Sequence, residues 1–171
     1  MTTPPLLSID QYLRTSYSPD VHFVDGELQE RNGGEYEHAR IQAILSAVFI
    51  QNEKAWRIKT VVEQRIRVNT ERVRICDIAA LRAVAPREPV TQTPPLICIE
   101  VLSPEDRLAR AELGLSDYLN MGVANIWLID PLRRSAYTFD ADGLHIADPA
   151  NLIVPGTPIH VDLVEAFSSL D

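Results

Sequence analysis

Two acidic residues stand in apolar segments of the chain, where a charged side chain is unfavourable. Asp77 interrupts the segment 74–81, and Glu100 interrupts the segment 96–102. A carboxylate among aliphatic neighbours must be neutralised, paired with a cation or bound to a metal. Both segments are short, apolar and rich in isoleucine, which predicts β-strands. The residues between them are enough for a loop that makes the two strands neighbours.

A pair of carboxylates on neighbouring strands is typical of a site for a hard divalent cation. Side chains alternate between the faces of a strand, so one inward acid from each strand can reach the same ion. Mg²⁺ or Mn²⁺ prefers oxygen ligands, and the carbonyl of Val101 would add a third ligand to Asp77 and Glu100. A cation held in this way can polarise a phosphodiester and activate water. The alternative is that arginines neutralise both acids in a structural network.

The composition limits the classes of protein to which the chain can belong. The 171 residues are 46% apolar and 23% charged, as expected of one ordinary globular domain. The net charge of −8 argues against a nonspecific nucleic-acid coat but not against a nuclease. No apolar run is long enough to cross a bilayer, and the first residues lack a signal-peptide pattern. We therefore expect a cytoplasmic protein with no membrane partner, in which Cys76 and Cys98 are buried thiols.

The segments around Glu100 predict a β-α-β unit. Segments 97–102 and 126–130 are apolar enough to be central strands, and a helix between them makes the two strands parallel. The helix is predicted over 103–120. Its signals are Ser103 as N-cap, Pro104 at the first helical position, Asp106 completing a capping box, a buried stripe of Leu108, Ala111, Leu115 and Leu119, and Gly122 as C-cap.

Periodicity and turn residues predict the remaining elements. Together they give a single α/β domain over residues 1–171 with a mixed β-sheet flanked by helices, and residues 1–7 form a lead-in expected to be flexible. The elements are a short helix capped by Ser8, a hairpin turning at Asp25-Gly26, a long helix over Glu35–Trp56, a hairpin over 56–81, a loop over 83–95, a hairpin turning at Asp142-Gly143, an edge element over 152–163 and a closing helix over 161–170.

A group of arginines on the predicted 56–81 hairpin is the best candidate for phosphate contact in this acidic chain. The group comprises Arg65, Arg67, Arg72 and Arg74. The alternative is an ordinary solvated strand face. His38 on the long helix has two readings as well, a surface or capping histidine, or a residue that supports the acids or contacts phosphate.

Several segments taken in order resemble one known family. They are Asp77, residues 99–107 (IEVLSPEDR), 117–123 (DYLNMGV) and 126–131 (IWLIDP), together with 24–27, 34–40 and 63–65 upstream. The chain is similar, from about Ser8 to Phe167, to the Uma-two-type restriction endonucleases of bacteria, in the PD-(D/E)XK nuclease superfamily. The resemblance implies a restriction-endonuclease-like core, Mg²⁺ dependence and hydrolysis of DNA phosphodiester bonds. It also implies that Asp77 and Glu100 are the first and second acids of the motif, with Glu37 as an accessory acid.

The chain departs from the family pattern at the motif lysine. The superfamily places it two residues after the second acid, where this chain has Leu102, and this family places it on the following helix, where the chain has Gly114. Arg110 lies one helical turn before Gly114 and is the candidate replacement, able to stabilise an anion although it stays protonated. A catalytically lapsed binding or interaction module is therefore the alternative to an endonuclease, and a purely structural assembly protein is a third reading. Cleavage of both DNA strands would favour a homodimer.

Overall fold

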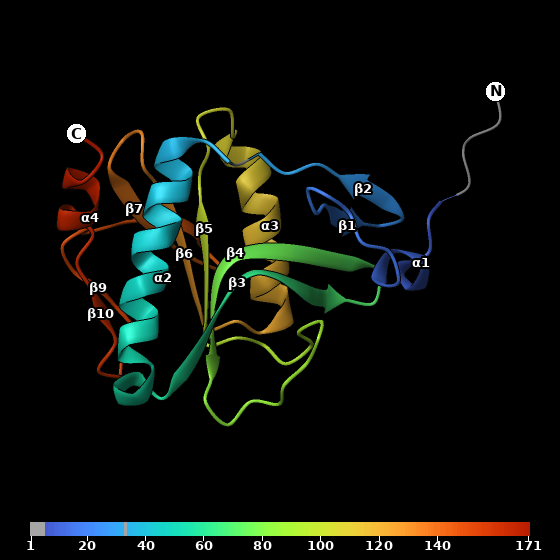
Figure 1. Cartoon of the computed structure of the whole chain (residues 1–171), viewed down its shortest axis with the longest axis horizontal. Coiled ribbons are helices and arrows are strands. Elements are labelled where there is room, and N and C mark those ends of the chain that lie inside the picture. Colours follow the sequence, from blue (N-terminus) through green and yellow to red (C-terminus); the bar gives the residue numbers. More distant parts are fainter. Residues whose placement is uncertain (1–5, 33) are drawn as a thin grey trace.

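The computed structural model of the chain describes residues 6–32 and 34–171 (Figure 1). Most of the predicted flexible lead-in, residues 1–5, lies outside the described residues. The described helices are α1 (Ile9–Leu13), α2 (Tyr36–Trp56), α3 (Leu108–Met121) and α4 (Val164–Ser168). The described strands are β1 (His22–Val24), β2 (Glu27–Gln29), β3 (Ile58–Asn69), β4 (Arg72–Arg82), β5 (Ile97–Val101), β6 (Asn125–Asp130), β7 (Ser135–Asp140), β8 (Gly143–Ala147), β9 (Leu152–Ile153) and β10 (His160–Val161).

An eight-stranded mixed sheet forms the centre of the molecule, with strands in the order β2-β1-β4-β5-β6-β7-β8 and β3 paired with β4. Only β5 and β6 are parallel among the described pairs of this sheet, and Glu100 lies opposite Leu128 between them. The helix that connects them explains the parallel pairing, since such a crossover returns the chain to the same end of the sheet. The α/β fold class and the β-α-β unit predicted from the sequence are confirmed.

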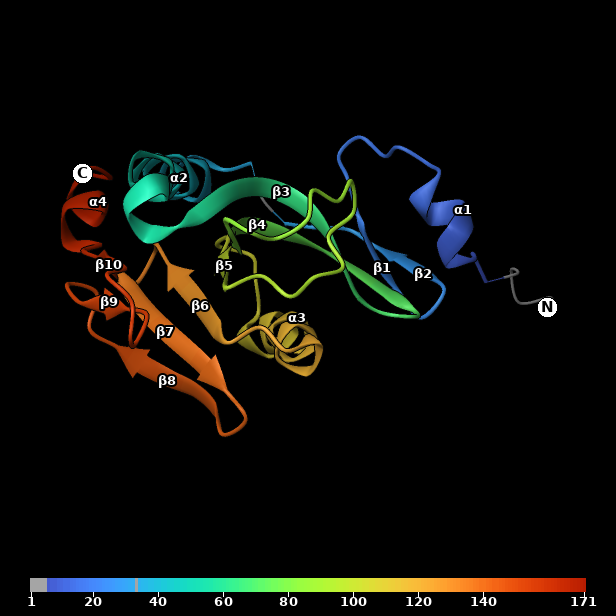
Figure 2. The ribbon, with the colours of Figure 1, turned by 90° about the horizontal axis from the view of Figure 1, so that it is seen from below.

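Two helices cover the two faces of the sheet (Figure 2). Ile41, Leu45 and Phe49 of α2 are buried with one face of the central strands, as their helical spacing predicts. Leu115 and Tyr118 of α3 are buried with the other face. The central strands are therefore apolar on both sides, which makes the two acids within them conspicuous. Among the described residues, no helix combines the length and the apolar character needed to cross a membrane.

The predicted start of the helix after β5 is wrong. The α-helix begins at Leu108, because Arg107 adopts extended backbone with φ −94° and ψ 133°. Asp106 does reach back to the N–H of Ser103, at 2.7 Å, but this bond closes a separate turn. The Ser103 hydroxyl is buried without a partner among the described residues. Leu108, expected to be buried, is 43% exposed because it lies in the first turn of the shortened helix.

The sheet contains a notch along one edge of β4. On that edge β1 pairs with β4 only at Arg72 and Val73, and β5 pairs with β4 from Ile78 onward. Between these points, residues 74–77 have no neighbouring strand, and the N–H of Ile75 donates instead to Nδ1 of His22 at 3.0 Å. Asp77 is the last residue of the notch, directly before the point where the sheet closes.

Candidate functional site

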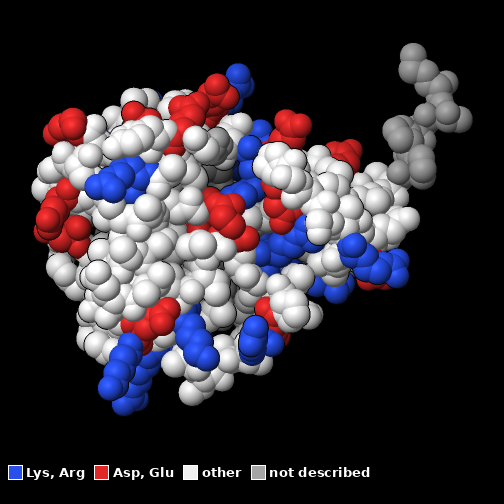
Figure 3. All heavy atoms as spheres, viewed as in Figure 1, with Lys and Arg blue, Asp and Glu red and all other residues white. Residues whose placement is uncertain are grey.

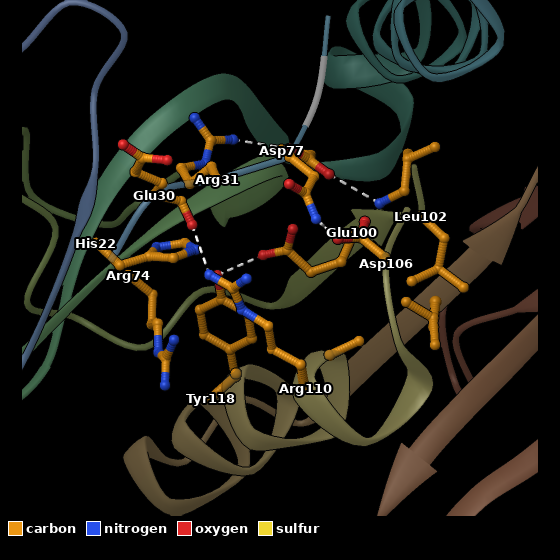
Figure 4. Close-up of a pocket in the computed structure, with 15 residues that line it drawn as sticks. His22, Glu30, Arg31, Arg74, Asp77, Glu100, Leu102, Asp106, Arg110 and Tyr118 are labelled. Atoms are coloured by element: carbon orange, nitrogen blue, oxygen red, sulfur yellow. Dashed lines mark hydrogen bonds and ion pairs between the residues drawn. The ribbon is translucent and has the colours of Figure 1, made fainter. Parts of the chain in front are cut away.

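A cavity of about 90 Å³, with mostly polar and charged residues in its lining, lies in this notch (Figure 4). Its walls come from β1, β4, β5 and β6, from α3 and from the loop that follows β2. The cavity has room for a cation with several waters, since a site of this measure needs only about 10–15 Å³ for each water. The lining residues are His22, Glu30, Arg31, Asn32, Arg74, Asp77, Glu100, Val101, Leu102, Asp106, Arg110, Ala111, Gly114, Tyr118 and Leu128.

The cavity brings Asp77 and Glu100 together. They are the residues next to Ile78 and Ile99, the last pair of the β4–β5 ladder. Figure 4 shows the Glu100 carboxylate directed into the space between Asp77 and α3. The long loop over 83–95 serves to return the chain so that the two strands run side by side. Val101 follows Glu100 in the same wall, and its N–H donates to Oδ2 of Asp77 at 2.8 Å.

Asp77 is 3% exposed and has three hydrogen-bond partners. Its Oδ2 accepts the Val101 N–H and lies 3.2 Å from Nε2 of His38. Its Oδ1 accepts from Nη2 of Arg31 at 2.9 Å. Since a carboxylate oxygen has two lone pairs, Oδ2 is saturated and Oδ1 keeps one lone pair for a further ligand.

The charges around Asp77 keep it ionised. Burial alone would raise the pKa of Asp77, but the hydrogen bond and charge of His38, the Val101 N–H and the charge of Arg31 together hold its pKa below the usual value. Burial lowers the pKa of His38 in turn, but the hydrogen bond and charge of Asp77 outweigh it and raise the pKa above the usual value. The pair therefore favours a charged imidazolium beside a charged carboxylate.

Glu100 has the opposite environment. Burial and the negative charge of Asp77 raise its pKa well above the usual value. Its Oε1 accepts from the hydroxyl of Tyr118 on α3 at 2.5 Å, and Oε2 has no hydrogen-bond partner among the described residues. Two carboxyl groups with divergent pKa values in one cavity repel each other when both are ionised. A divalent cation between them would remove this repulsion.

Two loop residues hold the wall opposite α3. Asn32 donates its side-chain N–H to Oδ1 of Asp106 at 2.7 Å, and the carbonyl of Glu30 accepts from Nη2 of Arg110 at 2.6 Å. These bonds fix both neighbours of Arg31 to the α3 side of the cavity. The role expected for Arg110 as a cation at the site remains a prediction, although the structure does place its guanidinium in the cavity wall.

The structure does not bring Glu37 to the cavity. It lies in the first turn of α2, one residue before His38. Consecutive helical residues point about 100° apart, so only one of the two can face Asp77. His38 takes that position, so Glu37 lies outside the cavity, and its expected role as an accessory acid stays a prediction. A histidine at 4% exposure in the first turn of a helix could not be assigned to Asp77 from the sequence because the two residues are far apart in the chain.

Most of the arginine group on β3 and β4 is occupied by ion pairs. Arg65 pairs with Asp20 at 2.6 Å, and Arg72 and Arg74 both pair with the buried Asp117 of α3 at 2.9 and 2.6 Å. These ion pairs occupy the three side chains within the protein, so phosphate contact by this arginine group remains a prediction. On the face that carries α2, acidic and basic side chains are intermixed (Figure 3).

The residues of the cavity fit a divalent cation with a small protein ligand set. The described ranges contain no cluster of three or more His, Cys, Asp or Glu side chains suited to a metal. However, Oδ1 of Asp77 and Oε2 of Glu100 have lone pairs available, and Mg²⁺ commonly binds through one or two carboxylates while keeping several waters. Burial and the negative charge of Asp77 raise the pKa of Glu100, and a bound dication would offset the repulsion between the two acids.

The fold matches a solved structure closely. The chain resembles a putative nuclease belonging to DUF820 from Anabaena variabilis ATCC 29413, with a TM-score of 0.83 over 96% of this chain and 99% of that one. The two sequences are 21% identical, so this likeness establishes the fold. None of the curated proteins compared matches the chain.

The sequence also matches a family over residues 9–163. This range spans α1 to the end of β10 and includes every residue that lines the cavity. The chain therefore belongs to the Uma2 family, whose description is "Putative restriction endonuclease".

Proposed function

We propose that the protein is a divalent-cation-dependent endonuclease that hydrolyses DNA phosphodiester bonds in the cavity between β4, β5 and α3. The observation that carries this proposal is the position of Asp77 and Glu100 in one cavity at the end of a strand pair. Two carboxylates with opposite pKa shifts are suited to binding a cation and to handling protons. Family membership supports the same reaction class.

Asp77 and Glu100 would hold the cation through Oδ1 and Oε2, with the carbonyl of Val101 as a third ligand. When bound, Mg²⁺ or Mn²⁺ supplies charge for the phosphate oxygens and lowers the pKa of water. Tyr118 orients Glu100 by donating to Oε1. His38 and the Val101 N–H orient Asp77 by saturating Oδ2. Arg110, in the cavity wall, can contact the phosphate of the substrate and stabilise its charge.

Nicking of supercoiled plasmid with Mg²⁺ or Mn²⁺ tests this proposal. We expect the wild type to nick, and we expect Asp77→Asn to lower the rate by about 100-fold or more, because one metal ligand loses its charge. Asp140→Asn is the matched control, since Asp140 pairs with His145 on the surface and should leave the rate unchanged. Equal nicking by wild type and Asp77→Asn would rule out this site.

A second candidate function is a lapsed nuclease that binds DNA or another partner without cleaving. The favouring observation is that Arg31, His38 and the Val101 N–H already provide Asp77 with donors from the protein. Leu102 and Gly114 at the two lysine positions point the same way. Fluorescence anisotropy with labelled duplex DNA separates the two functions. Binding that persists with no nicking in either Mg²⁺ or Mn²⁺ would favour the lapsed protein.

A further inference from the structure

Arg31 is a partly buried arginine in contact with Asp77, one of the two acids of the cavity. Its side chain is 15% exposed, and it forms ion pairs with Asp77 at 2.9 Å and with Glu63 of β3. Arg110, by contrast, bonds to a backbone carbonyl and is exposed. A charge removed from water interacts more strongly with its neighbours than one at the surface. Arg31 therefore has a greater electrostatic effect on Asp77 and Glu100 than Arg110 has.

The position of Arg31 is fixed from several directions. Its neighbours in the chain, Glu30 and Asn32, are held by Arg110 and Asp106. Glu63 accepts a hydrogen bond from Nη1 of Arg31 and another from the side-chain amide of Gln42 at 2.8 Å. Glu63 also has a φ of 51°, a left-handed conformation that is uncommon for glutamate. Such conformations persist where the surrounding structure requires them, often at functional sites.

Arg31 also separates two cavities. Together with Asn32 it lines both the 90 Å³ cavity and a second one of about 330 Å³ that includes His38, Gln42 and Glu63. A guanidinium has five N–H donors, and those on Nη1 and Nη2 that reach Glu63 and Asp77 account for two of them. Arg31 thus retains donors beside the space in which a phosphate would lie.

We propose that Arg31 and the divalent metal both bind Oδ1 of Asp77, and that Arg31 adds positive charge beside the reacting phosphate. The claim that Arg31 acts on a reacting phosphate rests on the proposed function. Two cations at one carboxylate repel each other, so Arg31 weakens metal binding while it favours the reaction. Arg31 is a positioning residue for Asp77, and its effects on metal affinity and on rate have opposite signs.

These opposite effects on metal affinity and on rate can be tested, because a purely structural role for Arg31 would not produce both. In the full-length protein, we expect Arg31→Met to bind Mn²⁺ about 10-fold more tightly by calorimetry, because a competing charge is gone. We expect the same variant to nick plasmid about 100-fold more slowly at saturating DNA, a loss in kcat rather than in KM. Arg31→Lys should stay near the wild type in both measurements, since it keeps the charge.

A lysine at Gly114 provides the rescue. Gly114 lines the same cavity, and a Cβ added there meets no atom within 4 Å. We expect Gly114→Lys in the Arg31→Met background to restore most of the rate and to return the Mn²⁺ affinity towards the wild-type value. Arg134→Met is the control for loss of an arginine, because Arg134 pairs with Asp171 on the surface. Thermal unfolding without metal checks that each variant folds.

The outcomes separate the two proposals. In one outcome the wild type nicks, Asp77→Asn abolishes nicking and Arg31→Met leaves it unchanged. This result supports the nuclease and overturns the inference on Arg31. Weaker or unchanged Mn²⁺ binding by Arg31→Met also overturns it, as does a slow Arg31→Met that Gly114→Lys does not rescue. If the wild type fails to nick, the proposed function and the catalytic effect of Arg31 are both overturned. Tighter Mn²⁺ binding by Arg31→Met would then still support the claim that Arg31 and the metal share Asp77. If neither protein binds Mn²⁺, that claim is overturned too.

Discussion

At the scale of single residues, the site depends on which charges are buried together. Asp77, Glu100, His38 and Arg31 come from four separate segments, and each changes the charge state of another. Burial makes every isolated charge costly, so partners decide whether a group stays ionised. Asp77 has cationic partners that keep it charged. For Glu100, burial and the negative charge of Asp77 favour the neutral form and outweigh the hydrogen bond from Tyr118, which favours the charged form.

His22 provides a test of burial at this scale. Burial and the charges of Arg74 and Arg31 lower the pKa of His22 to about 3. The unfolded chain takes up a proton near pH 6.5 and the folded protein does not, so folding is penalised as the pH falls from about 6.5 towards 3. The penalty is absent above the unfolded pKa and grows by about 1.4 kcal/mol per pH unit below it.

His22→Asn should remove this penalty while its Oδ1 accepts the N–H of Ile75 in place of Nδ1. Between about pH 7 and pH 5, we expect the wild type to lose about 2 kcal/mol more stability than the variant. Urea unfolding at the two pH values measures the difference, and other titrating groups cancel because both proteins contain them. Equal losses would mean that His22 titrates normally in the folded protein.

At the scale of elements, α3 is attached to the sheet by charge as well as by apolar contact. Asp117 of α3 is 5% exposed and receives Arg72 and Arg74 from β4. The same helix supplies Tyr118 to Glu100. The ion pairs therefore help to set where the helix lies relative to the cavity.

Removal of one partner of such a buried group leaves charges without compensation. We expect Asp117→Ala to lower the free energy of unfolding by about 3 kcal/mol or more, because Arg74 stays buried without a carboxylate. Asp171→Ala breaks the surface pair with Arg134 and should leave the urea midpoint unchanged. If Asp117→Ala were as stable as the wild type, the ion pairs would have no part in docking α3.

At the scale of the whole molecule, residues 6–32 and 34–171 provide one candidate cavity for catalysis, whereas the proposed substrate, duplex DNA, has two strands. The cavity lies along the notch beside β4, and residues of β1, of the loop after β2 and of α3 line it (Figure 4). A two-fold dimer would present two such cavities, one to each strand. Under the proposed function, the homodimer predicted from the sequence would therefore determine how the two strands of DNA are cut.

Sedimentation and the order of plasmid products test this link. We expect a sedimentation mass of about twice that of one chain, together with linear plasmid that appears without a long accumulation of the nicked form. A monomer that accumulates nicked circles before linear DNA would contradict the dimer. The active-site proposal would be unaffected by that result, because nicking requires only one cavity.

The sequence by itself determined the fold class, most elements and the two acids. Asp77 and Glu100 could be recognised because a charge in an apolar strand is costly wherever the strand lies. The Glu35–Trp56 helix and the Gly122 cap are likewise local properties of the chain, set by periodicity and by a glycine at φ 105°.

Only the tertiary structure decided which residues surround those acids. His38 replaces Glu37 beside Asp77, and Arg31 reaches it from a loop 46 residues earlier in the chain. The arginines of β3 and β4 could not be assigned to Asp20 and Asp117 either. The physical reason is that ion pairs form between groups brought together by strand pairing and helix docking, so no local pattern of residues encodes the partner.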